Sequence, residues 1–314
     1  MSKVDRRKWV PLICIFWFLL LAGSALAGGG KFYIVGMGSS PDLVTLRGLE
    51  TVKQADIFIL EEKSDLEAWK QWIGDKPVWY LGHISRVFYG VDPQTLKDPK
   101  KRAMAIRNAE ARKEIIAKIR EAVDQGKKVA ALQWGDPMMY GTTFYLEMLP
   151  KDFPAEIIPG IGAFQASSAA VKMSPPYGWD TSSVILTMTD WPGRKDKNKE
   201  LMKHKTSMVF YTMKLDYPGL FEQLKENYPK ATPVAVVLYA GDREKEKVLR
   251  STVGRFLKEI DYQNLPHEMH MLLVGKFLTV GQARKEGTTT HHKFIKQQHG
   301  DDPGGMIPGP TSGK

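Results

Sequence analysis

Apolar positions along the chain follow two periodicities, one typical of strands and one typical of helices. Short apolar runs at residues 31–35, 57–60 and 129–134 indicate buried strands. Stretches with helical spacing lie between them: one opens at Ser40-Pro41, and another covers about residues 109–124. The inward face expected for the first of these helices consists of Leu43, Leu46, Leu49, Val52 and Ala55.

The same alternation continues beyond residue 150. Two prolines within residues 149–154 indicate a short linker. The pattern therefore predicts the α/β class, with an N-terminal α/β domain over residues 28–150, a C-terminal α/β domain over residues 151–282 and a ligand cleft between them. Residues 76–107 mix aromatic and basic side chains and are predicted to form either a lid or a long surface loop. The strands expected in the second domain are residues 155–158, 183–189, 208–212, 234–239 and 271–274.

Both ends of the chain differ from this core. The first 27 residues carry basic residues up to Lys8, an apolar run over residues 9–21 and small residues that end at Ala25-Leu26-Ala27. This order is typical of a cleavable signal peptide, and an uncleaved N-terminal anchor is the alternative. The protein is accordingly expected to be exported (periplasmic) or anchored to the membrane by residues 9–21. Residues 283–314 are rich in glycine, proline and lysine and are expected to form a flexible tail.

Composition narrows the function classes. The formal net charge is +10, but the basic residues are spread along the chain, so a nucleic-acid partner is not expected. A basic cleft for a polyanionic small molecule and an ordinary solvated basic surface are both compatible with this charge. The only cysteine, Cys14, lies inside the predicted signal, which excludes a cysteine nucleophile or cysteine metal site from the mature chain. No metal site is expected.

Three glycine-containing segments are candidates for ligand binding. Gly36-Met37-Gly38 lies between a strand and a helix, which is the setting of a dinucleotide-binding turn, but the third glycine of that motif is missing. Gly135-Asp136-Pro137 ends a strand, where the sheets of α/β proteins bind ligands, and an ordinary turn is the alternative. Pro159-Gly160 precedes a helix of small residues, which suits either close approach of a ligand or tight packing on a sheet.

Together, the order and spacing of these segments resemble the tetrapyrrole (precorrin) methylase family over roughly residues 31–282. The resemblance rests on "FYIVGMGSSPDLVTLRGLETVKQADIFIL", "WGDPMMYG" and "IIPGIGAFQASSAA", followed by "SSVILTMT", "TPVAVVLYAGDREKEKVLRSTVGRF" and "HMLLVGKF". The C-terminal half looks most like methylases that act on carbon 11 of precorrin-4. The segments "SRVFYGVD" and "GDPMMYGTTFY" look more like those that act on carbon 20 of precorrin-2.

The resemblance implies two α/β domains with S-adenosyl-L-methionine in the cleft between them, usually in a homodimer. It implies methyl transfer from the sulfonium to a ring carbon of a tetrapyrrole, with no protein nucleophile, so the catalytic residues stay unknown. Arg47, Arg86, Arg194 and Lys214 are candidate clamps for the carboxylates of the macrocycle. The cofactor contacts that it implies are Gly38, Asp136, Met139, Gly162, Ala163, Thr212 and Ala240.

Two features depart from the family pattern. The first loop is a residue shorter than the family's Gly-x-Gly-Pro-Gly-Asp-Pro and lacks an acidic residue before Pro41. The signal also conflicts with a cofactor that is made in the cytoplasm. Three interpretations remain open: an anchored or unprocessed methylase, an exported protein that binds a tetrapyrrole or similar ligand without methylating it, and a nicotinamide-type oxidoreductase. If the protein binds a tetrapyrrole without methylating it, the candidates for stacking on the macrocycle are Trp134, Tyr140 and Trp179.

Overall fold

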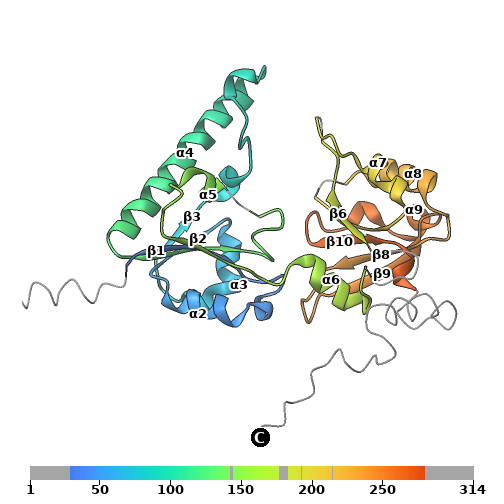
Figure 1. The fold of residues 1–314 in the computed structure, drawn as a ribbon, viewed down its shortest axis with the longest axis horizontal. Coiled ribbons are helices and arrows are strands. Elements are labelled where there is room, and N and C mark those ends of the chain that lie inside the picture. Colours follow the sequence, from blue (N-terminus) through green and yellow to red (C-terminus); the bar gives the residue numbers. More distant parts are fainter. Residues whose placement is uncertain (1–28, 142–143, 177–182, 192, 214, 280–314) are drawn as a thin grey trace, which may run out of the picture. The chain divides into compact units, whose positions relative to one another are not determined.

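The computed structural model describes residues 29–141, 144–176, 183–191, 193–213 and 215–279. The chain divides into two compact units, with the division between Ala166 and Ser167. Each unit contains one five-stranded sheet (Figure 1). The predicted signal, the predicted tail and Lys214 lie outside the described residues. Of the helices that the structure describes, none combines the length and apolar character needed to cross a membrane.

The sheet of the first unit is parallel throughout, with the strand order β3-β2-β4-β1-β5. Because strand β5 pairs with β1, the segment 155–158 belongs to the first unit, and the division falls later than the linker expected at residues 149–154. The strands are β1 (Lys31–Gly36), β2 (Ile57–Leu60), β3 (Val78–Tyr80), β4 (Lys128–Gln133) and β5 (Ala155–Ile158).

Helices cover both faces of this sheet, because successive side chains of a strand point to opposite sides. On one face, Phe32 and Ile34 of β1 pack with Ile119 of helix α4 (Pro99–Asp124) and with α5 (Phe144–Met148). On the other face, Val35 packs with residues of α2 (Leu46–Gln54) and α3 (Lys63–Ile73). Figure 1 shows α4 and the α2–α3 pair on the two sides of the sheet.

Two details of this unit differ from the sequence expectations. Val52 and Ala55 are buried as expected, but Leu46 is 82% exposed, because the regular helix begins only there and its inward face starts at Gly48 and Thr51. Helix α4 starts at Pro99, ten residues before the expected start. The carboxylate of Asp98 caps it by accepting from the backbone N of Lys100 at 2.8 Å.

The predicted lid or surface loop contains strand β3, two short 3₁₀ turns (Gly82–Ser85 and Pro93–Thr95) and the start of α4. Side chains of α4 hold this segment. The buried Arg112 donates to the carbonyls of Ile84 at 2.5 Å and Val87 at 3.3 Å, and Asn108 also donates to Val87 at 3.2 Å. These hydrogen bonds attach residues 84–87 to helix α4.

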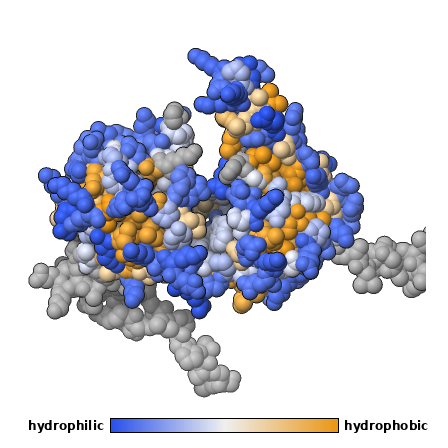
Figure 2. All heavy atoms as spheres, turned by 180° about the vertical axis from the view of Figure 1, so that it is seen from behind, coloured by the Kyte–Doolittle hydropathy of each residue, from blue (hydrophilic) through white to orange (hydrophobic). Residues whose placement is uncertain are grey.

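The second unit has a mixed sheet with the strand order β6-β7-β10-β8-β9. Strands β6 and β7 are parallel, whereas β10 runs antiparallel to both β7 and β8. Its core is formed by the sheet with α8 (Tyr217–Asn227) and α9 (Phe256–Glu259), and a short helix α7 (Asn198–Leu201) precedes β7. In Figure 2, hydrophobic side chains gather over part of each unit and are bordered by hydrophilic ones. The strands are β6 (Val184–Met188), β7 (Ser207–Tyr211), β8 (Pro233–Leu238), β9 (Lys247–Thr252) and β10 (His270–Val274).

Candidate functional site

The carboxyl ends of three neighbouring parallel strands meet in the first unit. Strand β1 ends at Gly36, β4 leads into Gly135, and β5 leads into Gly160. A Cβ atom added to Gly160 would lie 2.2 Å from the Gly135 carbonyl oxygen and 2.7 Å from the carbonyl carbon of Gly36. One added to Gly36 would lie 2.5 Å from the backbone N of Gly160. These contacts leave no space for side chains, so glycine at Gly36 and Gly160 lets the three loops touch.

The first glycine loop is joined to the Gly-Asp-Pro loop by backbone hydrogen bonds. The backbone N of Met37 donates to Gln133 at 2.8 Å, and the backbone N of Gly135 donates to Gly38 at 2.8 Å. Gly38 has a φ of +82°, and a Cβ there would meet the Leu43 carbonyl oxygen at 2.6 Å. This position therefore needs glycine both for its backbone conformation and for the turn packed against it.

Asp136 organises the Gly-Asp-Pro loop from within. Its half-buried carboxylate accepts from the backbone N of Met138 at 2.9 Å, and its carbonyl accepts from the backbone N of Met139 at 3.1 Å. A Cβ on Gly162 would lie 3.5 Å from the Cβ of Asp136, so these two predicted contacts are neighbours. Helix α6 (Ala163–Val171) begins beside them, and the amides of its first turn have no acceptor within the helix.

Large apolar side chains are exposed in the loops at this edge. Trp134 is fixed: its indole N donates to the Asp65 carboxylate at 2.9 Å, and its ring lies 4.7 Å from the ring of Trp69. Exposed apolar surface beside a glycine-rich loop suits the binding of a flat or partly apolar molecule. The exposed side chains are Trp134, Met138, Met139, Tyr140 and Ile161.

The second unit places Thr212 and Ala240 at one edge of its sheet. Thr212 follows β7 and Ala240 follows β8, and the two strands run in the same direction because each is antiparallel to β10. The hydroxyl of Thr212 donates to the carbonyl of His270, the first residue of β10, at 2.6 Å. Thr212 and Ala240 are 3% and 8% exposed, so only small surfaces of either are open to a ligand.

His270 is buried at the same edge and contacts Tyr217. Its Nε2 lies 2.5 Å from the Tyr217 hydroxyl. Burial lowers the pKa of the imidazole to about 4. The ring is therefore neutral at physiological pH, and burial likewise raises the pKa of Tyr217. This arrangement is typical of a packed histidine that holds the start of a strand.

The candidate carboxylate clamps have different surroundings. Arg47 is exposed on α2, and Arg86 is half-exposed in an ion pair with Glu61, with Nη2 and Oε2 2.7 Å apart. The Arg194 side chain is only 5% exposed and donates to the Met188 carbonyl at 3.0 Å, which argues against a role as an open clamp. Lys214 lies outside the described residues.

Gly36 lies in one of the predicted ligand-binding segments and Arg194 is one of the candidate clamps, but the sequence did not show the contacts of either residue. Gly36 lies in a motif that also fits a dinucleotide turn. The reason for a glycine there, the close backbone of Gly160, is visible only in the structure. In the sequence Arg194 looks like one of many basic residues, because its contacts with the Thr187 hydroxyl and the Met188 carbonyl form only in the folded loop.

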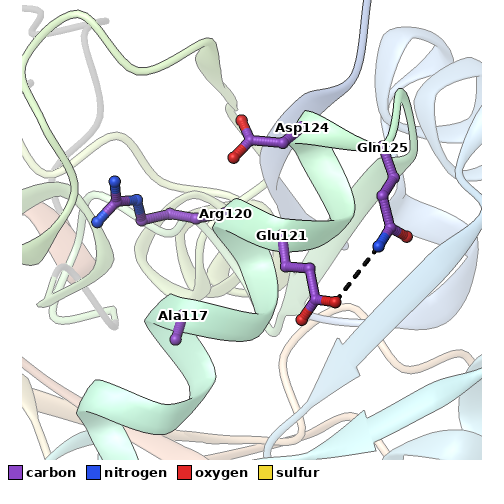
Figure 3. Close-up of a pocket in the computed structure, with 5 residues that line it drawn as sticks. All are labelled: Ala117, Arg120, Glu121, Asp124 and Gln125. Carbon is purple, nitrogen blue, oxygen red and sulfur yellow. Dashed lines mark hydrogen bonds between the residues drawn. The ribbon is translucent and has the colours of Figure 1, made fainter.

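Depressions away from the glycine loops lie on the described parts of both units, one of them, of about 320 Å³, between residues 204–207 and 228–232. A second, of about 410 Å³, is formed by exposed residues at the C-terminal end of α4, which leads to the amino end of β4, opposite the glycine loops (Figure 3). Another, of about 190 Å³, is lined by residues of the loop after β6 and of the start of α8, among them Asp190 and Asp216. In the described ranges, no group of three or more histidine, cysteine or acidic residues is placed to hold a metal ion. The depression on α4 is lined by Ala117, Arg120, Glu121, Asp124 and Gln125.

Known proteins resemble this chain over most of its length. The cobalt-precorrin-4 C(11)-methyltransferase of Methanocaldococcus jannaschii is 29% identical over 258 residues, covering 79% of this chain and 88% of the relative. A solved cobalt precorrin-4 methyltransferase matches with a TM-score of 0.61 at 23% identity, covering 80% of this chain and 96% of that one. A uroporphyrin-III C-methyl transferase of Thermus thermophilus, complexed with S-adenyl homocysteine, matches with a TM-score of 0.56 at 15% identity, covering 79% and 99%.

These solved structures have the fold described above, and both are named as methyltransferases. The resemblance to the tetrapyrrole methylases that the motifs predicted is confirmed, and so is the α/β fold class with two units. A sequence model of the Tetrapyrrole (Corrin/Porphyrin) Methylases matches residues 31–257, and the chain therefore belongs to this family.

Proposed function

We propose that this protein is a methyltransferase that uses S-adenosyl-L-methionine to methylate a precorrin-like tetrapyrrole. The observation that carries the proposal is the junction of Gly36, Gly135 and Gly160 at the carboxyl edge of the first sheet, in a chain of this family. That junction brings backbone amides and carbonyls close together without side chains between them, which suits a cofactor bound mainly by the main chain.

The proposed cofactor contacts lie at the carboxyl edge of the first sheet and beyond the carboxyl ends of β7 and β8 in the second. In the first unit they are Gly38, Asp136, Met139, Gly162 and Ala163, where the start of α6 offers amides to a carboxylate. In the second unit they are Thr212 and Ala240. S-adenosylmethionine supplies a methyl group on a sulfonium. The chain's own residues hold donor and acceptor in line, and this orientation provides most of the acceleration.

The proposed substrate is a large ring with carboxylate side chains. The exposed Trp134 and Tyr140 offer faces for the ring, and the exposed Arg47 offers a cation for a carboxylate. The first loop lacks an acid before Pro41, but Asp42 follows it, and the Ser40 hydroxyl donates to this carboxylate at 2.8 Å. A negative group is therefore still present on this loop, one residue after the proline.

The location and assembly of the protein are also proposals. We propose that residues 9–21 direct export or anchor the chain and that the protein is a homodimer. Mass spectrometry of the N-terminus from cell fractions tests the first point, since cleavage after Ala27 removes the basic residues and the apolar run. Sedimentation of the purified protein tests the second point.

Calorimetric titration of the full-length protein with S-adenosylmethionine, and with S-adenosylhomocysteine, tests the proposed cofactor. Micromolar binding of both is expected. Gly162→Trp is expected to abolish binding in a folded protein. Gly162→Ala is the matched control, because the one tight contact of its Cβ is the flexible end of Gln165 at 2.9 Å, and its 3.5 Å distance to the Cβ of Asp136 is an ordinary contact. Asp136→Ala is also expected to lose binding, through the freed amide of Met138. Unchanged affinity in both Gly162→Trp and Asp136→Ala would remove the proposed pocket.

Transfer of a labelled methyl group tests the reaction. The acceptors to compare are uroporphyrinogen III and cobalt-precorrin-4, which the names of the similar proteins suggest. Label found in one of these macrocycles supports the proposal and identifies the acceptor. Tight cofactor binding without transfer to either macrocycle would contradict the proposed substrate.

A further inference from the structure

We infer that the loop after β6 is a binding surface for the tetrapyrrole, with Trp191 contacting the ring and Lys195 and Lys197 contacting its carboxylates. This inference rests on the proposed function and adds to it a contact region in the second unit. The loop starts at the carboxyl end of β6, which runs parallel to β7, so it begins at the same edge of the sheet as Thr212.

The base of the loop is built from buried polar side chains. The Arg194 guanidinium donates to the Met188 carbonyl through Nη1 at 3.0 Å and to the Thr187 hydroxyl through Nη2 at 2.8 Å. The Thr187 hydroxyl in turn donates to Asn198 at 2.7 Å. Thr187 and Asn198 are both almost fully buried, and burying a guanidinium is costly unless it is well partnered. The loop is thus fixed by a dense polar network.

This network carries an exposed aromatic side chain. Trp191 is 50% exposed, and the guanidinium carbon of Arg194 lies 5.1 Å from its ring centroid, within cation–π distance. A tryptophan in contact with a buried, fully engaged arginine has less conformational freedom than a tryptophan on an unsupported loop. A ring that is already ordered loses less entropy when a planar ligand stacks on it.

The charges of the same loop match a polycarboxylate. Lys195 and Lys197 are exposed, and the acidic residue between them, Asp196, is engaged by Arg194, with Nε and Oδ1 3.1 Å apart. The hydrogen bond from Arg194 lowers the pKa of Asp196, so this carboxylate stays ionised beside the guanidinium. Asp190 of the same loop also pairs with Arg194, with Oδ1 and Nη1 3.3 Å apart, so both acidic side chains of the loop contact this guanidinium. The loop also presents one aromatic surface and two exposed lysines, a combination that suits a flat macrocycle with acidic side chains.

Binding of uroporphyrin III, the stable oxidised macrocycle, to the full-length protein tests the inference. Trp191→Ala is expected to weaken binding about tenfold, and Trp191→Phe is expected to keep most of the affinity, because a phenyl ring still stacks. The double variant Lys195→Ala/Lys197→Ala is expected to weaken binding about tenfold at low salt and less at high salt. Its matched control is Lys225→Ala/Lys258→Ala, which removes two exposed lysines from helix C-terminal turns of the same unit.

S-adenosylmethionine affinity and thermal midpoint are measured for every variant and are expected to stay at wild-type values. Uroporphyrin III affinity that is unchanged in Trp191→Ala and in the Lys195/Lys197 variant overturns the inference, as does a wild-type protein that binds S-adenosylmethionine but not uroporphyrin III. In both cases the proposed cofactor stands. A wild-type protein that binds neither ligand overturns the proposed function as well.

Discussion

Gly160→Ala is expected to force apart the ends of three strands in the first unit. The new Cβ would lie 2.2 Å from the Gly135 carbonyl oxygen, in the loop after β4, and 2.8 Å from the carbonyl oxygen of Gly36, at the end of β1. A contact distance is well above 3 Å, so the backbone of at least one loop has to move by almost an ångström. Overpacking of this kind costs about 3 kcal/mol, the upper end of its usual range, because no flexible side chain can give way.

Urea unfolding followed by circular dichroism measures this cost. Two control variants separate the possible causes: Gly29→Ala has nothing within 4 Å of its Cβ, and Gly126→Ala has equally open space but a φ of +79°. We expect no measurable change for Gly29→Ala and a cost of about 1 kcal/mol for Gly126→Ala. A Gly160→Ala protein as stable as Gly29→Ala would refute the close contact of the three loops.

Two further predictions concern the second unit. Arg194→Met is expected to lower the free energy of unfolding by about 3 kcal/mol, because it leaves buried acceptors without their donor. The control variant Arg255→Met removes an exposed ion pair with Glu259 and is expected to lower it by less than about 0.5 kcal/mol. Equal costs in urea unfolding would contradict the buried network. The pKa of the buried His270 is about 4, below the value of about 6.5 expected in the unfolded chain. Between these two pH values the unfolded chain binds a proton and the folded protein does not, so the free energy of unfolding is expected to fall by roughly 3 kcal/mol as pH falls from about 6.5 to about 4. The wild-type protein should therefore lose this much stability relative to His270→Gln over that range, and parallel pH curves would show that the ring is not desolvated.

The sequence was sufficient to predict the strands that are buried on both faces. Strands β1, β4 and β10 are continuous apolar runs, and their positions are confirmed within a residue or two. The polar edge strand β9 was not predicted, since its residues are mostly half-exposed and carry no apolar run. The start of α4 was missed because its first turns are lysine-rich and exposed, although Asp98-Pro99 is a typical helix start.

The candidate site was predicted in part for a similar reason. Motifs placed Gly38, Asp136 and Gly162 in loops that the structure brings to one edge of a sheet. The environment of a charged side chain is not visible in a motif, because it depends on contacts made only after folding. Arg86 and Arg194 were equivalent candidates in the sequence, yet one is half-exposed on the surface and the other is the centre of a buried network.

The position of β1 also has a consequence for synthesis and for the proposed export. It is the first strand to be made, yet its two partners in the sheet, β4 and β5, follow only after the long helix α4. Strand β1 has no partner until residues 128–133 have been made, and the sheet is complete only after residue 158 has been made. An export machinery that threads unfolded chains would thus meet the N-terminus of this protein before its first unit has folded.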